Sequence, residues 1–149
     1  QAKTLFPYTT LFRSGRRSEA ALITGLKLLA EGDCIGIYPE GTRSPDGRLY
    51  KARTGIARLA IESGAPVIPV AMFNTDKIQP TGKVIPKVKR VGMTFGEPMY
   101  FEGDSSNAIF LRECADSIMK RIQQMSGQEY VDTYAVKGAK PAADKNDED

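Results

Sequence analysis

The stretch CIGIYPEGTRS, Cys34–Ser44, joins a short apolar run to a polar turn. The run Cys34–Pro39 is nearly continuous in apolar side chains, which is typical of a strand covered on both faces. An acid, a glycine, a hydroxyl and an arginine follow at its carboxyl end. Because ligands of open α/β sheets gather outside the carboxyl ends of parallel strands, we expect the turn to face a ligand.

The segments around this stretch predict alternating strands and helices. Helical spacing of apolar residues, with a glycine just beyond, predicts helices over Ser18–Glu31, Thr54–Ser63 and Ser105–Met125. A second continuous apolar run, Val67–Phe73, predicts another buried strand. Alternation over Val88–Gly96 predicts a strand nearer an edge of the sheet. Cys34–Pro39 and Val67–Phe73, joined through a helix, predict a right-handed parallel crossover.

These elements indicate an α/β fold with a largely parallel sheet flanked by helices. The 149 residues suffice for about one domain. We divide them into residues 1–14, which we set aside, a partial domain over residues 15–127, and a flexible, disordered tail over residues 128–149 that ends in DKNDED.

The first fourteen residues, QAKTLFPYTTLFRS, show no signal or fold-consistent pattern. Residues 4–14, TLFPYTTLFRS, resemble codon by codon the in-frame translation of a common short-read sequencing adapter. The alternative is a short aromatic β-strand. We therefore expect a non-native segment joined to a carboxy-terminal fragment, whose natural residues before Gly15 are missing.

Composition excludes several function classes. The formal charge of +3 is modest and its lysines and arginines are scattered, so no nucleic-acid partner is expected. There is no histidine and no Cys-x-x-Cys spacing, so no metal site is expected. Cys34 and Cys114 lie in apolar stretches, which favours two buried thiols in a reducing compartment. No apolar run approaches the roughly 20 residues of a membrane-spanning helix, although peripheral membrane contact stays possible.

The polar turn has the groups that a phosphate ester requires. Gly41 allows close backbone approach, Thr42 offers a hydroxyl, and Arg43 offers a planar fork matched to two phosphate oxygens. Glu40 cannot bind a dianion by charge. We expect it to orient Arg43, accept a hydroxyl or pair with a basic neighbour such as Arg53. The alternative is a surface loop whose groups satisfy one another.

A family resemblance rests on several of these segments together. IYPEGTRSPDG, the following KARTG, the helix and then APVIPVA resemble, in content, order and spacing, the third and fourth sequence blocks of the glycerophospholipid acyltransferases related to 1-acylglycerol-3-phosphate acyltransferase. The resemblance covers about Gly15–Gly127. It implies a partial acyltransferase domain whose amino-terminal elements are missing.

The resemblance also implies a reaction and a location. The intact protein would transfer an acyl group from acyl-CoA or acyl-ACP to 1-acyl-sn-glycerol-3-phosphate, giving phosphatidic acid in phospholipid biosynthesis. Its partners would be the lysophospholipid and the acyl thioester, which is a co-substrate, with no further cofactor. It would lie at the cytoplasmic face of the membrane, peripherally or anchored through the missing amino-terminal part.

Site residues are carried over block by block. In such families the P-E-G-T-R block is assigned to the acceptor's phosphate, a role that would fall to Glu40, Gly41, Thr42 and Arg43. Arg53, before the glycine of KARTG, is either a second phosphate contact or a solvated helix start. The V-I-P-V-A block would line or support the pocket through Val67, Ile68, Pro69, Val70 and Ala71. For Val67 and Val70, plain burial in a strand explains the sequence equally well.

The family's catalytic pair is a histidine and an aspartate in an H-x-x-x-x-D block, with the histidine as general base. No segment of this chain matches that block. We therefore expect no catalytic residue and no acyl transfer by this chain, because general-base catalysis alone contributes about 10²- to 10⁴-fold. The main alternative is a non-catalytic phospholipid- or phosphate-binding module. A nucleotide-binding βαβ protein is a more distant one, because no G-x-G-x-x-G follows a strand.

The segment Thr81–Arg90, TGKVIPKVKR, carries four basic residues near a probable sheet edge. They would either contact anionic headgroups or, as charged edges commonly do, keep the strand soluble. A fragment without its first strands would expose a sheet edge, so we expect poor solubility or aggregation.

Overall fold

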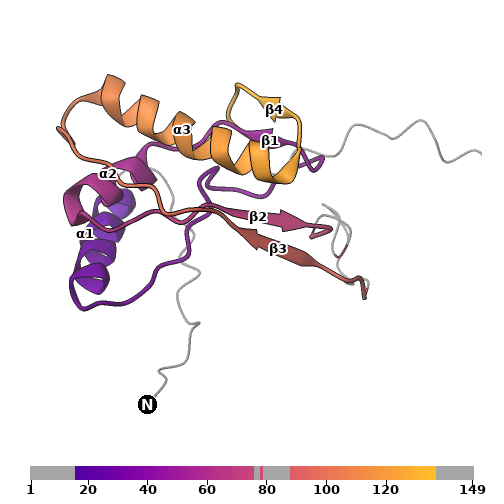
Figure 1. The fold of residues 1–149 in the computed structure, drawn as a ribbon. Coiled ribbons are helices and arrows are strands. Elements are labelled where there is room, and N and C mark those ends of the chain that lie inside the picture. The colour runs from indigo at the N-terminus through magenta and orange to yellow at the C-terminus, as the bar shows by residue number, and fades with distance from the viewer. Residues whose placement is uncertain (1–15, 76–77, 79–87, 137–149) are drawn as a thin grey trace, which may run out of the picture.

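The computed structural model describes residues 16–75, 78 and 88–136. Figure 1 shows three helices and four short strands within this part of the chain. In order they are α1 (Arg16–Ala30), β1 (Leu49–Tyr50), α2 (Gly55–Ser63), β2 (Val70–Phe73), β3 (Gly92–Phe95), α3 (Ala108–Ser126) and β4 (Tyr130–Val131). The predicted α/β class is confirmed. The predicted non-native segment, residues 1–14, lies outside the described residues, as do residues 81–87 of the basic segment.

The strands form two separate pairs. β1 pairs with β4 in parallel, and β2 pairs with β3 antiparallel. Parallel pairing in the described residues is therefore confined to the short β1–β4 ladder, whereas the prediction had a largely parallel sheet built around Cys34–Pro39 and Val67–Phe73.

Helix α3 is the centre of the hydrophobic core. It crosses above the β2–β3 pair and runs towards β1 and β4 (Figure 1). Its inner face packs against α2 and the segment around β1, where small and large apolar side chains are buried together. The cluster consists of Leu49, Ala52, Ala57, Leu111, Cys114, Ala115 and Met119.

The helix ends follow simple capping rules. Gly64 and Gly127 end α2 and α3 with positive φ of 66° and 70°, and each donates its N–H to a carbonyl of the last turn. α3 begins at Ala108, three residues after the predicted start at Ser105. The side chain of Asn107 accepts hydrogen bonds from the N–H groups of Ile109 and Phe110, and this N-cap sets the start of the helix.

The apolar run Cys34–Pro39 does not form the predicted buried strand. None of the described residues forms a strand ladder with it, so its backbone lacks ladder hydrogen bonds. Tyr38 is 71% exposed and Ile37 39% exposed. The thiol of Cys34 is exposed for the same reason, contrary to prediction, whereas Cys114 is buried as predicted.

The segment after α3 also differs from its prediction as a flexible tail beginning at residue 128. Leu49 lies opposite Tyr130, and Tyr50 lies opposite Val131. The N–H of Leu49 donates to the carbonyl of Glu129 at 2.9 Å. Two ladder pairs and one buried alanine, Ala135, hold the segment. Because these contacts require no long apolar run, the sequence did not reveal them. Residues 137–149 lie outside the described residues.

The β2–β3 pair leaves one apolar face uncovered. Ala71 faces the core and is fully buried. Met93 and Phe95, which alternate in the strand as predicted, are 55% and 67% exposed. Ile68, just before β2, is half exposed as well. In the described part of the chain, no helix combines the length and the apolar composition that crossing a bilayer requires.

Arg112 ties α3 to the chain between β1 and α2. Its Nη1 donates to the carbonyl oxygen of Ala52 at 2.7 Å. Its Nε donates to Asp116 at 3.0 Å. Nη2 of Arg112 also lies 2.6 Å from Oδ1 of Asp116, an ion pair without hydrogen-bond geometry. The side chain of Arg112 is 22% exposed and that of Asp116 is 44% exposed, so these contacts are partly shielded from water.

We expect Arg112→Met to lower the free energy of unfolding by about 2 kcal/mol, because the Ala52 carbonyl and the Asp116 carboxylate would lose a charged donor. Urea denaturation measures the change. Arg121→Met is the matched control, since Arg121 lies on the same helix without an ion pair in the described residues, and should change stability by about 0.5 kcal/mol or less. Equal losses in both variants would contradict the assigned role of Arg112.

We expect Phe95→Thr to reduce self-association, because it removes a large exposed apolar side chain while keeping strand propensity. Sedimentation velocity at several protein concentrations measures this. Val136→Thr is the control, because Val136 is also exposed, at 69%, but lies outside the β2–β3 face. Unchanged association of the Phe95 variant would show that this face does not drive it.

Candidate functional site

The turn after Pro39 and the segment before α2 are joined by backbone and side-chain contacts. Gly41 donates its N–H to the carbonyl of Tyr38 at 3.0 Å and has φ of 73°, a conformation that favours glycine. Arg53 donates its N–H to the carbonyl of Pro39 at 2.7 Å. A Cβ on Gly41 would lie 3.5 Å from Cγ of Arg53. The stem of the arginine therefore crosses directly over the glycine of the turn.

The basic side chains near the turn fall into two groups. Arg48 contacts Asp46 at 2.6 Å, and Lys51 contacts Asp132 at 2.8 Å. Arg43 and Arg53 are exposed, and neither has a carboxylate within ion-pair distance among the described residues. The second group is thus able to bind an external anion.

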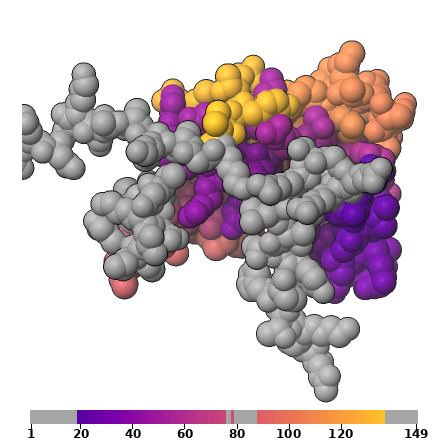
Figure 2. Space-filling model, turned by 180° about the vertical axis from the view of Figure 1, so that it is seen from behind, coloured from indigo at the N-terminus to yellow at the C-terminus, as the bar shows by residue number. Residues whose placement is uncertain are grey.

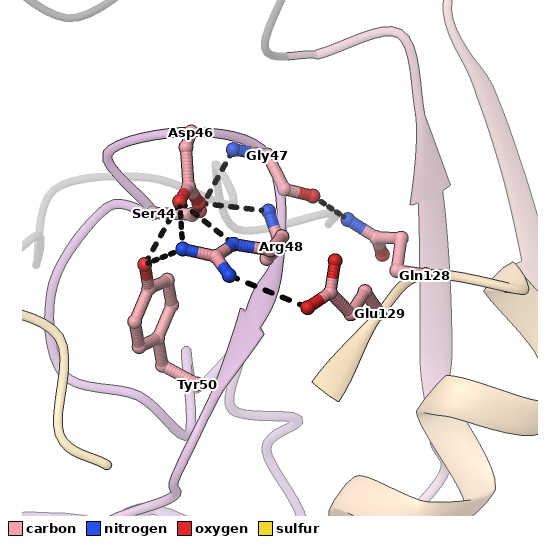
Figure 3. A network of polar contacts seen from close by, with 7 residues as sticks. All are labelled: Ser44, Asp46, Gly47, Arg48, Tyr50, Gln128 and Glu129. Carbon is pink, nitrogen blue, oxygen red and sulfur yellow. Dashed lines mark hydrogen bonds and ion pairs between the residues drawn. The ribbon is translucent and has the colours of Figure 1, made fainter. Parts of the chain in front are cut away.

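A polar network holds the loop that follows the turn (Figure 3). Asp46 is at its centre, accepting hydrogen bonds from Arg48 Nε at 2.8 Å and from the hydroxyl of Tyr50 at 3.0 Å. Partial burial disfavours the ionised form, but these donors outweigh it and lower the pKa of Asp46 to about 2. Ser44 belongs to the same loop, where its hydroxyl accepts the N–H of Gly47 at 2.9 Å.

The network reaches across to the end of the described chain. Arg48 Nη1 contacts Glu129 at 3.3 Å, and Gln128 donates to the carbonyl of Gly47 at 2.6 Å. Sequence reasoning missed these residues. The P-D-G sequence, Pro45–Gly47, is a turn signal that could have singled out Asp46, but no local pattern reveals partners 81 positions away.

Glu40 begins the turn and is close enough to this network for the backbone of Tyr50 and the charge of Asp46 to act on it. One carboxylate oxygen, Oε2, is buried and has no hydrogen-bond partner among the described residues. Burial raises the pKa of Glu40 to about 7, a backbone hydrogen bond from Tyr50 opposes the rise, and the charge of Asp46 adds to it. The expected ion pairs of Glu40 with Arg43 or Arg53 are not formed. Burial therefore brings the titration of Glu40 towards neutral pH.

The structure thus brings Glu40, Gly41 and Arg53 together, and Thr42 and Arg43 are next to them in the chain. The other predicted site residues, 67–71, lie in or just before β2. Pro69 and Ala71 are buried, while Ile68 is half exposed. These residues, with Val67 and Val70, belong to or directly precede β2, which packs against α3. Val67 forms an isolated bridge with Met99. Among the described residues, no hydrogen bond or ion pair joins them to the turn.

A shallow hollow on the surface involves other residues. It lies between α3 and the segment of β4, and no predicted site residue lines it. Its lining consists of Asp116, Lys120, Gln123, Tyr130 and Asp132.

Sequence matches connect the chain to proteins of one family. The profile of the family described as Acyltransferase matches residues 3–73, a range that includes the set-aside residues 4–14. The chain is 42% identical over 57 residues to the chloroplastic 1-acyl-sn-glycerol-3-phosphate acyltransferase BAT2 of Brassica napus, covering 38% of this chain and 17% of the relative. It is 38% identical over 64 residues to 1-acyl-sn-glycerol-3-phosphate acyltransferase of Borreliella burgdorferi, covering 43% and 26%.

A solved structure agrees with these matches. The crystal structure of the 1-acyl-sn-glycerophosphate (LPA) acyltransferase PlsC from Thermotoga maritima superimposes with a TM-score of 0.57 at 28% identity, covering 70% of this chain and 44% of that one. The chain therefore spans less than half the length of these relatives. Profile, relatives and fold agree that the chain is similar, over part of its length, to acyltransferases that are named 1-acyl-sn-glycerol-3-phosphate acyltransferases.

Proposed function

We propose that this chain binds the phosphate of 1-acyl-sn-glycerol-3-phosphate, for acylation to phosphatidic acid by the whole enzyme. The observation that carries the proposal is the pair Arg43 and Arg53. Both are exposed and lack carboxylate partners in the described residues, while nearby Arg48 and Lys51 are paired. The names of the relatives supply the acceptor.

The chemistry of the turn suits a phosphate monoester. Each guanidinium can donate two parallel hydrogen bonds to phosphate oxygens, and the hydroxyl of Thr42 can add another. Gly41 has no side chain, so the stem of Arg53 can pass close to the backbone of the turn. When Glu40 is protonated, it does not repel a dianion, and a dianion nearby would favour that protonated form further.

The reaction requires groups beyond this site. The acceptor hydroxyl attacks the thioester carbon of acyl-CoA or acyl-ACP, a C–O bond forms, the C–S bond breaks, and the thiol leaves. A general base takes the hydroxyl proton. Because the chain contains no histidine, we expect it to bind the acceptor without turnover. An acyl chain on the acceptor would bring the site to a membrane surface, and we place it peripherally at the cytoplasmic face.

The absence of histidine also fits a non-catalytic phosphate- or phospholipid-binding module. The gene sequence upstream of the codon for Gly15 distinguishes the two. An in-frame H-x-x-x-x-D block would favour the enzyme, and a start codon directly before Gly15 would favour the module.

We expect Arg43→Met to weaken binding of sn-glycerol 3-phosphate by about tenfold or more, because it removes a bidentate charged donor. Isothermal titration, or NMR titration where affinity is low, measures the change. Glycerol without phosphate is the ligand control and Arg121→Met the variant control. Wild-type affinity in the Arg43 variant, with the variant shown to be folded, would refute the proposed phosphate site.

We expect Glu40→Gln to flatten the pH dependence of stability between pH 5 and pH 8. The pKa of Glu40 is about 7 in the folded chain against an ordinary 4.5. The folded state therefore holds this proton longer, and stability falls as pH rises from about 4.5 through 7. Asp46 acts oppositely, but only below pH about 4.

Urea denaturation at pH 5 and pH 8 tests this expectation. The free energy of unfolding of the wild type, relative to that of Glu40→Gln, should be lower at pH 8 than at pH 5. Glu113→Gln, which changes an exposed glutamate on α3, is the control. A constant difference between wild type and Glu40→Gln at the two pH values would show that burial does not perturb Glu40.

A further inference from the structure

The guanidinium of Arg53 rests on an aromatic ring from the far end of the described chain. Its central carbon lies 4.1 Å from the centroid of the Tyr134 ring. The stem of Arg53 meanwhile crosses over Gly41. The side chain therefore extends from the turn to Tyr134, and its charged end is in contact with the ring face.

The chain on both sides of Tyr134 is held in place. Thr133 accepts the N–H of Lys51 at 3.0 Å, and Ala135 is 7% exposed. Figure 2 shows this yellow end of the described chain lying beside purple residues from the first half of the sequence. The ring is thus presented from a fixed backbone, while Tyr134 itself is 44% exposed.

The backbone of Arg53 is equally constrained. Its N–H donates to Pro39, and the preceding carbonyl, of Ala52, accepts from Arg112 at 2.7 Å. The remaining freedom of Arg53 lies in its side-chain torsions. Ordering a long side chain on binding costs free energy, and a stacking partner that orders it beforehand reduces that cost.

We propose that Tyr134 is a positioning residue, whose ring holds the guanidinium of Arg53 beside the Glu40–Arg43 turn for contact with a phosphate monoester. Stacking occupies a face of the guanidinium and leaves the N–H groups at its edge able to donate to phosphate oxygens. This role rests on the proposed function, because it requires that Arg53 contacts the acceptor phosphate.

The test uses the 149-residue chain and sn-glycerol 3-phosphate, with NMR titration of the wild type and Tyr134→Leu. We expect the leucine variant to bind about two- to fivefold more weakly, as a lost cation–π contact predicts. Tyr134→Phe keeps the ring and should bind like the wild type. Tyr100→Leu, which changes another exposed tyrosine, is the matched control and should have no effect.

Two further measurements separate positioning from a general loss of structure. The ring should shift the side-chain proton resonances of Arg53 upfield in the wild type and Tyr134→Phe, and this shift should vanish in Tyr134→Leu. In an Arg53→Met background, Tyr134→Leu should cause no additional loss of affinity, because Tyr134 acts through Arg53. Urea denaturation reports whether each variant is folded.

The outcomes distinguish the two proposals. If Arg53→Met weakens binding but Tyr134→Leu does not, the positioning role is refuted and the phosphate site stands. If Tyr134→Leu weakens binding equally in both backgrounds, or if the resonances of Arg53 do not shift, the positioning role is refuted as well. If Arg53→Met does not affect binding, the positioning role is refuted, and if Arg43→Met does not affect binding, the proposed phosphate site itself fails.

Discussion

The short parallel ladder between β1 and β4 is the contact on which the candidate site depends. Its two residue pairs place the segment after α3 against the loop that follows the EGTRS turn. Three further contacts use this alignment: Gln128 with Gly47, Arg48 with Glu129 and Lys51 with Asp132. Two-stranded ladders are weak by themselves. The buried cluster under α3 includes Leu49, and partly buried Tyr130 packs against it, which holds this ladder in place.

This alignment also determines which charges are neutralised within the protein. Asp46, Glu129 and Asp132 neutralise cations on the β1 side of the turn. The two arginines nearest Gly41 are left to solvent within the described residues, one of them resting on an aromatic ring. A phosphate ligand therefore would not have to compete with internal carboxylates for them. Half-buried Glu40 adds little opposing charge when protonated.

The sequence predicted the parts of this arrangement that depend on local chemistry. Glycines at 64 and 127 marked helix ends because left-handed backbone strongly favours glycine there. It failed where structure depends on distant partners. Cys34–Pro39 has the composition of a buried strand, but composition does not supply the neighbour that a strand must pair with. Tyr134 stands in a polar stretch without periodicity, so nothing local marked it as a partner of Arg53.

The separation of 81 positions between β1 and β4 has a consequence for synthesis on the ribosome. A nascent chain grows from the amino terminus, so the EGTRS turn emerges long before the strand that aligns its loop. Until then Arg48 has only its local partner Asp46, and Lys51 lacks the carboxylate of Asp132. Closing so large a loop is also entropically costly and slow. The distant carboxylates that pair with Arg48 and Lys51 are therefore supplied only after 81 further residues have been synthesised.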